Sequence, residues 1–215
     1  MSKPIFCILG KTGAGKSTLL DFFMKGTIKI DVKLKKLVYH TTRNIREGEI
    51  NGVDYYFEDK DIFSSGKVKF KDIVEMRDYT TKNDGSIFYY TLNSDFDMED
   101  CDGIICAASV DQAIKYMKAK ENVYFIILDI PVRERMLRVL KRGNPSEKTC
   151  LELCRRILEE DEEFSAIWDL ANENNSVVLH QASEDPKKEL GIYDDIMYNW
   201  DEIESMLELI KSKCQ

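Results

Sequence analysis

The stretch Gly10-Lys11-Thr12-Gly13-Ala14-Gly15-Lys16-Ser17 decides the fold, because it matches the pattern G-x-x-x-x-G-K-[ST] at every required position. In this pattern the glycines let backbone N–H groups turn inward around phosphate oxygens, the lysine reaches the β- and γ-phosphates, and the final hydroxyl holds Mg²⁺. An apolar run at residues 4–9 precedes the loop as a buried strand would, and residues 18–25 follow it as a helix. The sequence therefore predicts a nucleotide-phosphate site made by Gly10, Thr12, Gly13, Ala14, Gly15, Lys16, Ser17 and Thr18.

The composition is that of one generous globular domain or two small ones: 215 residues, of which 43% are hydrophobic and 33% are charged. This hydrophobic content excludes the disordered and collagen-like classes. Because the formal net charge is −8, we expect no nucleic-acid partner and no membrane-surface partner. Apolar runs such as 104–110 and 123–128 are too short to cross a bilayer, and the N-terminus leaves no room for a secretory apolar region. Six scattered cysteines without a C-x-x-C pair favour reduced thiols in a cytoplasmic protein.

Short apolar runs alternate with helical patterns along most of the chain, which indicates a parallel sheet covered on both faces. The expected strands, besides residues 4–9, are 36–40, 102–109, 123–130 and 176–180. The expected helices, besides 18–25, are 111–120, one opened by Pro131 that runs to about 141, 148–169, and an amphipathic helix from about 200 to 210. The predicted fold class is therefore α/β, a P-loop three-layer α/β/α arrangement with a parallel core sheet.

Two segments depart from this alternation. Residues 38–97 carry alternating apolar positions and are rich in Tyr, Phe, Thr and Asp, which predicts a small, half-exposed β-rich insertion. Residues 183–199 fit no element.

A second cluster of anion-binding side chains lies in the segments His40-Thr41-Thr42-Arg43, Arg46-Glu47-Gly48-Glu49 and Asn51-Gly52-Val53-Asp54-Tyr55. Two arginines three residues apart, a glycine-marked turn and a tyrosine can gather donors around one dianion. The same spacing also fits a solvated loop with unconnected arginines, so spacing alone leaves the role of this cluster open.

These segments closely resemble the GMP-binding segment of guanylate kinases, and together with the phosphate loop they are far more specific than either motif. The resemblance is strong over residues 5–57 and patchy from there to about His180, where Arg138, Arg142-Gly143, Arg155 and Arg156 resemble the arginine-bearing lid of that family. It implies a single domain over residues 1–215, with a core at about 1–37 and 100–215, an acceptor-binding insertion at about 38–97 and a short helical lid at about 138–160. The implied activity is ATP-dependent phosphorylation of a nucleoside monophosphate, GMP or dGMP to GDP or dGDP, in a monomer or a homodimer.

The resemblance also implies roles for individual residues. The acceptor site would consist of Tyr39, Arg43, Arg46, Tyr55, Glu75, Tyr89 and Thr91. Within it, the arginines and tyrosines 55 and 89 would hold the monophosphate, Glu75 would accept hydrogen bonds from guanine N1 and N2, and Thr91 would place its hydroxyl against the base. The residues alone also fit blander roles, namely a surface carboxylate for Glu75, a packing ring for Tyr89 and solvation for Arg138.

At the donor end, the resemblance implies that ATP with Mg²⁺ occupies the phosphate loop. Ser17 would bind the metal ion, and Asp111 is a displaced candidate for a second metal ligand. Charge on the transferring phosphoryl group would be neutralised by Lys16, Arg138, Arg142 and Arg156.

Several departures from the family pattern affect base reading and metal support rather than the phosphate-binding residues. Tyr39 stands where the family usually has a serine that helps to read guanine, and Tyr90 replaces a glycine. The acidic pair usual before the central helix is missing from residues 105–109, and His180 stands near the place of an asparagine. The sequence therefore leaves two alternatives open: a P-loop kinase of another deoxynucleoside monophosphate or of ribose 1,5-bisphosphate, and a guanylate-kinase-like binding domain without catalysis.

Overall fold

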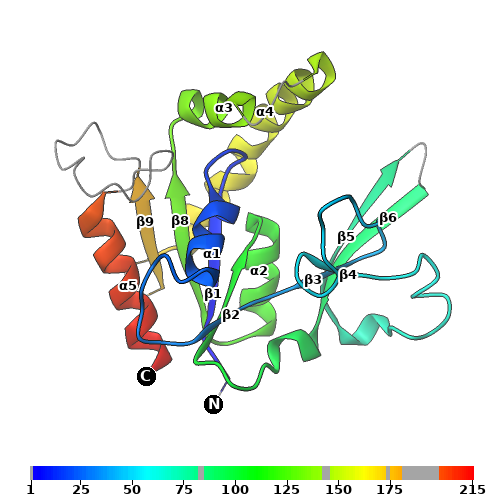
Figure 1. Cartoon of the computed structure of the whole chain (residues 1–215), viewed down its shortest axis with the longest axis horizontal. Helices are drawn as coiled ribbons and strands as arrows, with labels where there is room; N and C mark the ends of the chain where they lie inside the picture. The colour runs from blue at the N-terminus through cyan, green and yellow to red at the C-terminus, as the bar shows by residue number, and fades with distance from the viewer. Residues whose placement is uncertain (1, 82–84, 142–145, 173–174, 181–198) are drawn as a thin grey trace.

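The computed structural model describes residues 2–81, 85–141, 146–172, 175–180 and 199–215. Its core is a five-stranded sheet in the order β2-β7-β1-β8-β9, in which every pairing is parallel. The strands are β1 (Ile5–Gly10), β2 (Leu34–Lys36), β7 (Gly103–Ala107), β8 (Val123–Asp129) and β9 (Ser176–His180). Because β1 is the central strand, the loop that follows it emerges at the middle of the carboxyl edge of the sheet (Figure 1).

Helices cover both faces of this sheet, which explains why its strands are continuously apolar. On one face, Ile5, Cys7 and Leu9 pack in a core with α2 (Val110–Ala119) and α4 (Glu147–Leu170). On the other face, Phe6 and Ile8 pack in a core with α1 (Lys16–Met24) and α5 (Trp200–Cys214). The three-layer α/β/α arrangement is confirmed.

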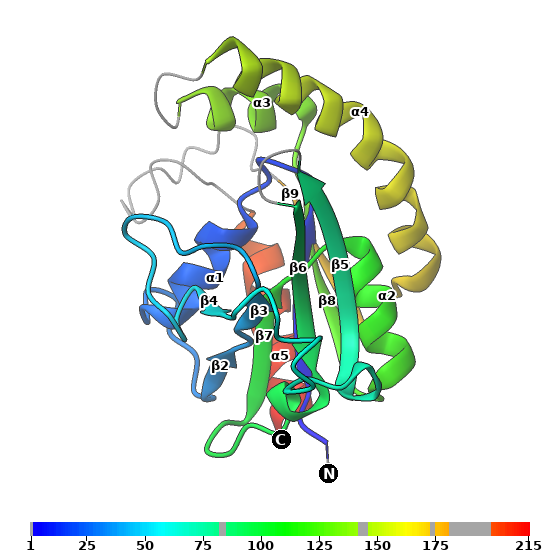
Figure 2. The ribbon, with the colours of Figure 1, turned by 90° about the vertical axis from the view of Figure 1, so that its right-hand side faces the viewer.

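A second, smaller sheet stands beside the core in the order β4-β3-β6-β5 (Figure 2). It is formed by β3 (Tyr39–Thr41), β4 (Tyr55–Phe57), β5 (Ile73–Thr81) and β6 (Gly85–Leu92), with two short 3₁₀ turns, η1 (Phe70–Asp72) and η2 (Asn93–Phe96). The β5–β6 pair is antiparallel, with Glu75 opposite Thr91 and Arg77 opposite Tyr89. The β-rich insertion expected between residues 38 and 97 is therefore present as a sheet of its own.

The single strand expected at residues 36–40 is wrong, because the chain passes between the two sheets at this point. β2 ends at Lys36 in the core sheet, and β3 begins at Tyr39 in the small sheet. Between them, the fully buried Leu37 donates its backbone N–H to Ile105 O at 2.9 Å, the last backbone bond before the crossing. A short apolar run cannot show that its two halves pair with different sheets.

Two helices lie over the carboxyl edge of the core sheet. α3 (Val132–Lys141) begins after Pro131, as expected, and α4 arches from the top of the molecule down beside α2 (Figure 2). Among the described residues, no helix is long and apolar enough to span a membrane.

Candidate functional site

The phosphate loop connects β1 to α1 and depends on glycine at two positions. Gly13 has φ +82°, and a Cβ built there would lie 2.5 Å from the backbone oxygen of Arg135. Gly15 has φ +102° and caps the N-terminus of α1 in a left-handed conformation. The pattern that predicted the loop therefore has a steric cause as well as a chemical one.

Lys16 folds back over its own loop. Its Nζ donates to the backbone oxygen of Gly10 and, at 3.4 Å, to that of Lys11. Burial lowers the pKa of Lys16, and the nearby Glu160 carboxylate opposes that shift. Ser17, next in the chain, is exposed in the first turn of α1.

A carboxylate outside every sequence motif also contacts the loop. Glu160 of α4 accepts a hydrogen bond of 2.6 Å from the backbone N–H of Thr12 and another from the Thr12 hydroxyl. Its Oε2 also lies 3.8 Å from the guanidinium of Arg135. Because Glu160 reaches the loop only through the packing of a distant helix, no local pattern could have predicted this contact.

Of the four expected charge-neutralising residues, the structure brings Lys16 and Arg138 to the loop. Arg138 of α3 donates to the backbone oxygen of Ala14 at 3.2 Å. Arg135, one turn earlier and 3% exposed, donates to Thr12 O at 3.1 Å and was not expected there. Arg142 lies outside the described residues.

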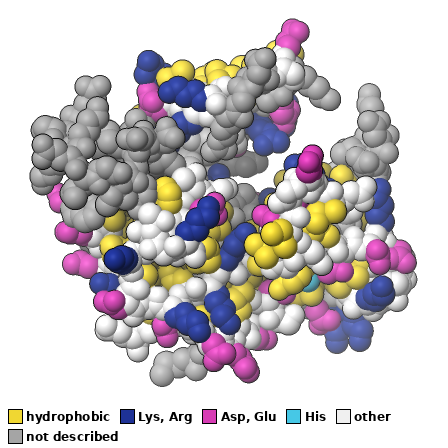
Figure 3. Space-filling view, viewed as in Figure 1, with side chains coloured by type: hydrophobic (Ala, Val, Ile, Leu, Met, Phe, Trp, Pro, Cys, Tyr) yellow, Lys and Arg dark blue, Asp and Glu magenta, His cyan; other side chains and the backbone are white. Residues whose placement is uncertain are grey.

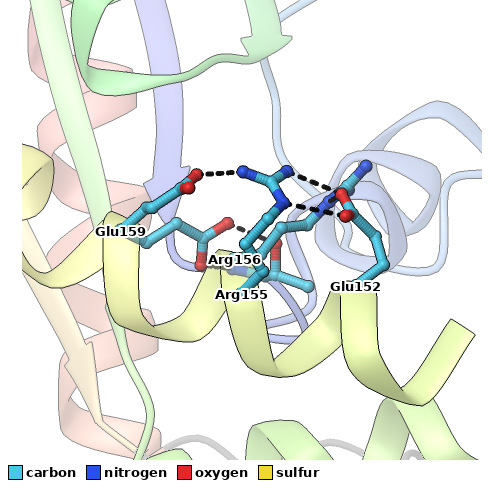
Figure 4. Close-up of polar contacts among 6 residues, drawn as sticks. Glu152, Arg155, Arg156 and Glu159 are labelled. Atoms are coloured by element: carbon cyan, nitrogen blue, oxygen red, sulfur yellow. Dashed lines mark hydrogen bonds and ion pairs between the residues drawn. The ribbon is translucent and has the colours of Figure 1, made fainter. Parts of the chain in front are cut away.

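Arg156 is held by its own helix. It donates to Glu152 at 2.9 Å, while Arg155 bridges Glu152 and Glu159 along the same side of α4 (Figure 4). These four side chains are about half exposed. The structure therefore shows Arg156 in a helix-surface ion-pair network.

Of the four expected acceptor-phosphate side chains, those of Arg43, Tyr55 and Tyr89 meet on the small sheet, whereas that of Arg46 is exposed. Arg43 donates both terminal nitrogens to Glu49, at 2.8 and 2.7 Å, and its Nε to the Tyr89 hydroxyl at 3.1 Å. The Tyr55 ring lies against the same guanidinium, 5.2 Å away. The Arg43 hydrogen bonds lower the pKa of Glu49 to about 2, and Arg46 adds its backbone N–H at 2.8 Å. The Glu49 carboxylate thus occupies the cluster of Arg43, Tyr55 and Tyr89 (the anion grip), whose hydrogen-bond donors also suit a phosphate.

The other end of the same sheet face holds a buried carboxylate. Glu75 is 1% exposed, lies opposite Thr91, and its Oε2 accepts a hydrogen bond of 3.3 Å from Gln112. Its Oε1 lies 2.9 Å from Arg77 Nε, but in a geometry in which neither atom has a hydrogen-bond partner among the described residues. Burial raises the pKa of Glu75, and Arg77 acts against that shift. Glu75 is therefore a buried carboxylate with unused acceptor capacity rather than a surface residue.

The two tyrosines that depart from the family pattern both have structural explanations. The Tyr39 hydroxyl donates to the backbone oxygen of Ala107 at 2.9 Å. Tyr90 is fully buried on the opposite face of β6, where it stacks on His40 with ring centroids 4.9 Å apart. Tyr90 therefore leaves the face that carries Tyr89 and Thr91 unobstructed.

One cleft of about 280 Å³ joins the two ends. It is lined by Gly10, Lys11 and Lys16 of the loop, by Glu160 and Phe164 of α4, by Tyr39, Tyr55 and Arg77 of the small sheet, and by residues 107–110 and Gln112 between them. The space-filling view shows the molecule deeply notched between the α3–α4 helices and the small sheet (Figure 3).

Asp111 is paired with Lys115 at 2.7 Å, and the described residues contain no group of three or more His, Cys, Asp or Glu that could hold a metal ion.

A glycine-rich loop between β1 and α1 at the carboxyl edge of a parallel sheet, with a small sheet that carries clustered cationic side chains beside it, defines a P-loop α/β protein. A sequence model described as guanylate kinase matches residues 1–185, and the chain belongs to the guanylate kinase family.

Individual relatives agree with this assignment. The guanylate kinase of Mycoplasma genitalium is 31% identical over 170 residues, which are 76% of this chain and 65% of that protein. The guanylate kinase of Halalkalibacterium halodurans is 25% identical over 179 residues, 81% of this chain and 82% of that protein. The chain spans less than two thirds of the length of the Mycoplasma relative and 56% of that of the Mesoplasma florum guanylate kinase. A crystal structure of guanylate kinase from Anaplasma phagocytophilum shares the fold, with a TM-score of 0.51 and 19% identity over 100% of this chain and 89% of that one.

Proposed function

We propose that this chain transfers the γ-phosphoryl group of ATP to GMP or dGMP, forming GDP or dGDP. The observation that carries the proposal is the cleft that the phosphate loop shares with Arg77 and Tyr55, with the Arg43–Tyr89 contact and the buried Glu75 carboxylate on the adjoining sheet face. The phosphate loop suits a triphosphate. On the small sheet, Tyr89 of the expected monophosphate site lies two residues along β6 from Thr91, which pairs with Glu75, the carboxylate expected to bind the base.

The residues at the donor end would act by position and charge, since phosphoryl transfer needs in-line placement and neutralisation more than covalent chemistry. The loop N–H groups and Lys16 would hold the phosphates, and Arg138, already on the loop, would stabilise charge on the equatorial oxygens. We assign no general base. Arg142 and Arg156 are proposed to neutralise the same charge. Arg156 would first have to break its hydrogen bond to Glu152.

Ser17 fits a magnesium ligand, because its side chain is exposed directly after Lys16 in the first turn of α1. A magnesium ion held there would supply positive charge against the phosphates of ATP. Asp111 is a weaker candidate, since its carboxylate is paired with Lys115 on α2.

At the acceptor end, Glu75 favours guanine over adenine. Guanine offers donors at N1 and N2, whereas adenine presents a lone pair at N1 that would face the carboxylate. A site built on buried hydrogen bonds can reject the wrong partner by about 10⁴-fold. Thr91, opposite Glu75, would place its hydroxyl against the base, and Arg46 would join Arg43, Tyr55 and Tyr89 at the phosphate.

We propose the domain division already described, with the lid at about 138–160 formed by the end of α3 and the first half of α4. Lid closure over the cleft would exclude water from the γ-phosphate.

All six cysteines are free thiols, which supports a cytoplasmic location.

The experiment is ADP release from ATP and Mg²⁺ with GMP, dGMP, AMP, CMP, UMP, dTMP and ribose 1,5-bisphosphate as acceptors, with Lys16→Ala as the blank. Turnover confined to GMP and dGMP supports the proposal. Turnover on another acceptor keeps the phosphoryl-transfer site but overturns the base-reading assignments. The absence of turnover on every acceptor favours a binding domain.

A further inference from the structure

The Arg77 side chain lines the cleft together with Tyr39 and Tyr55, and none of the contacts proposed for ATP or GMP uses its guanidinium. It lies two residues after Glu75 on β5, so both side chains project from the same face of the small sheet. Its side chain is 28% exposed, and its guanidinium lies 5.9 Å from the centre of the Tyr89 ring. A cation therefore stands between the buried carboxylate and the anion grip.

The contact between Arg77 and Glu75 leaves both groups incompletely satisfied. Arg77 Nε and Glu75 Oε1 are 2.9 Å apart, yet both atoms are buried without a hydrogen-bond partner among the described residues. Buried charged atoms that lack hydrogen bonds are costly, and they are expected where a ligand completes the network. Arg77 lines the cleft, and Glu75 is buried directly behind it, so a cationic donor and a carboxylate acceptor adjoin each other at the cleft wall.

The ligand edge that matches this pair has a carbonyl oxygen next to an N–H donor. Guanine carries that arrangement, with O6 beside N1–H and the N2 amine. We propose that Arg77 is a specificity-determining residue that donates a hydrogen bond to the 6-carbonyl oxygen of the acceptor base, while Glu75 accepts from its N–H groups. This inference rests on the proposed function and extends it by one residue.

The position of Tyr39 explains why such a donor is needed. The family resemblance implies that Tyr39 takes the place of a serine that helps to read the base, but the Tyr39 hydroxyl already donates to Ala107 O. The guanidinium of Arg77, on the neighbouring wall of the cleft, restores a donor that the tyrosine cannot supply. An arginine fork is well suited to the guanine carbonyl.

The test compares Arg77→Met with the parental enzyme on GMP, IMP and 2-aminopurine ribonucleoside monophosphate. The first two carry O6 and N1–H, whereas the third keeps the N2 amine that Glu75 would bind but lacks O6 and N1–H. Because its N1 lone pair would face Glu75, it is expected to bind the parental enzyme more weakly than GMP does, and only the change in its Ki on substitution is compared. We expect the KM for GMP and for IMP to rise by about 10- to 100-fold, with unchanged KM for ATP. The Ki of the 2-aminopurine nucleotide as a competitor of GMP should stay the same. Arg133→Met, an exposed arginine on α3, is the matched control and should change none of these constants.

Equal losses on all three nucleotides would overturn the inference, because they would show that Arg77 acts only by holding Glu75 in place. Unchanged KM for GMP would overturn it as well. Thermal melting checks that Arg77→Met folds; if it does not, Arg77→Lys carries the same comparison. Because lysine keeps a donor and the charge beside Glu75, we expect a smaller loss from it, again confined to nucleotides that have O6. Failure of the proposed function is a separate result, since the parental enzyme would then not phosphorylate GMP at all.

Discussion

The Glu160 carboxylate lies against Thr12, accepting a hydrogen bond of 2.6 Å from its backbone N–H and a second from its hydroxyl. Glu160 belongs to α4, 148 residues further along the chain, yet it occupies donors of the loop that we assign to ATP phosphate. The negative charge of Glu160 also raises the pKa of Lys16, against the lowering that burial causes. An anionic side chain therefore competes with the phosphates of ATP for this loop.

We expect Glu160→Gln to bind ATP more tightly than the parental protein. The amide keeps the size of the side chain but removes a negative charge beside the phosphate site, where repulsion of about 1 kcal/mol corresponds to roughly fivefold in Kd. Titration calorimetry with ATP measures the change directly. Glu159→Gln is the control, since Glu159 pairs with Arg155 on the exposed side of the same helix. Weaker ATP binding by Glu160→Gln would show instead that the carboxylate holds the loop in its binding conformation.

Gly13→Ala should destabilise the fold more than Gly26→Ala does. Both glycines have positive φ, +82° and +69°, so both alanines adopt a left-handed backbone that costs about 1–2 kcal/mol. A Cβ at Gly26 meets nothing within 4 Å, whereas one at Gly13 meets the backbone oxygen of Arg135 at 2.5 Å. Because backbone cannot move aside cheaply, we expect an additional loss of about 1–3 kcal/mol in the free energy of unfolding. Urea denaturation measures both variants, and equal losses would show that α3 yields at Arg135 without cost.

His40 should stabilise the protein more at low pH than at high pH. Its Nδ1 lies 2.9 Å from Glu58 Oε1 and its Nε2 lies 3.3 Å from Asp95 Oδ1, between the rings of Tyr56 and Tyr90. Burial lowers the pKa of His40, but the hydrogen bonds and charges of the two carboxylates outweigh it, so the pKa in the folded protein is raised. This stabilisation is fully present below about pH 6.5, the unfolded value, and is lost as the pH rises through the folded value.

The measurement is the melting temperature of the parental protein and of His40→Asn at pH values from below about 6.5 to above the pKa of His40 in the folded protein. We expect the difference between them to be about 2–4 °C larger at low pH than at high pH, which corresponds to about 1 kcal/mol in a chain of this size. A difference that grows with rising pH, or that does not change, would mean that His40 is neutral in the folded protein.

The parts of the fold that the sequence predicted well are those whose signals are local. The phosphate loop, the strand before it and the helix after it follow from glycine placement and apolar runs within a short stretch. The small sheet was predictable from the alternation of residues 38–97, but the crossing at Leu37 was not, because one apolar run serves two sheets.

In the candidate site, too, the residues that belong to local motifs were predicted, and those brought in by tertiary packing were not. Arg43, Tyr55 and Tyr89 meet as the resemblance implied, since their segments carry a recognisable pattern. Glu160 and Arg77 reach the cleft through tertiary packing, and neither belongs to the motifs that the sequence presents. Tyr90 replaces a glycine of the family pattern, and strand alternation turns its ring to the other face of β6.

Glu75 is the residue that would select guanine, and the most direct test of this role compares kcat/KM for GMP and AMP in the parental enzyme and in Glu75→Gln. The buried carboxylate predicts a parental preference for GMP of the order of 10⁴, which should fall by about 100-fold or more in the variant while the KM for ATP changes by less than about twofold. A variant that retains the parental ratio of GMP to AMP turnover would contradict the assignment of Glu75 to the base.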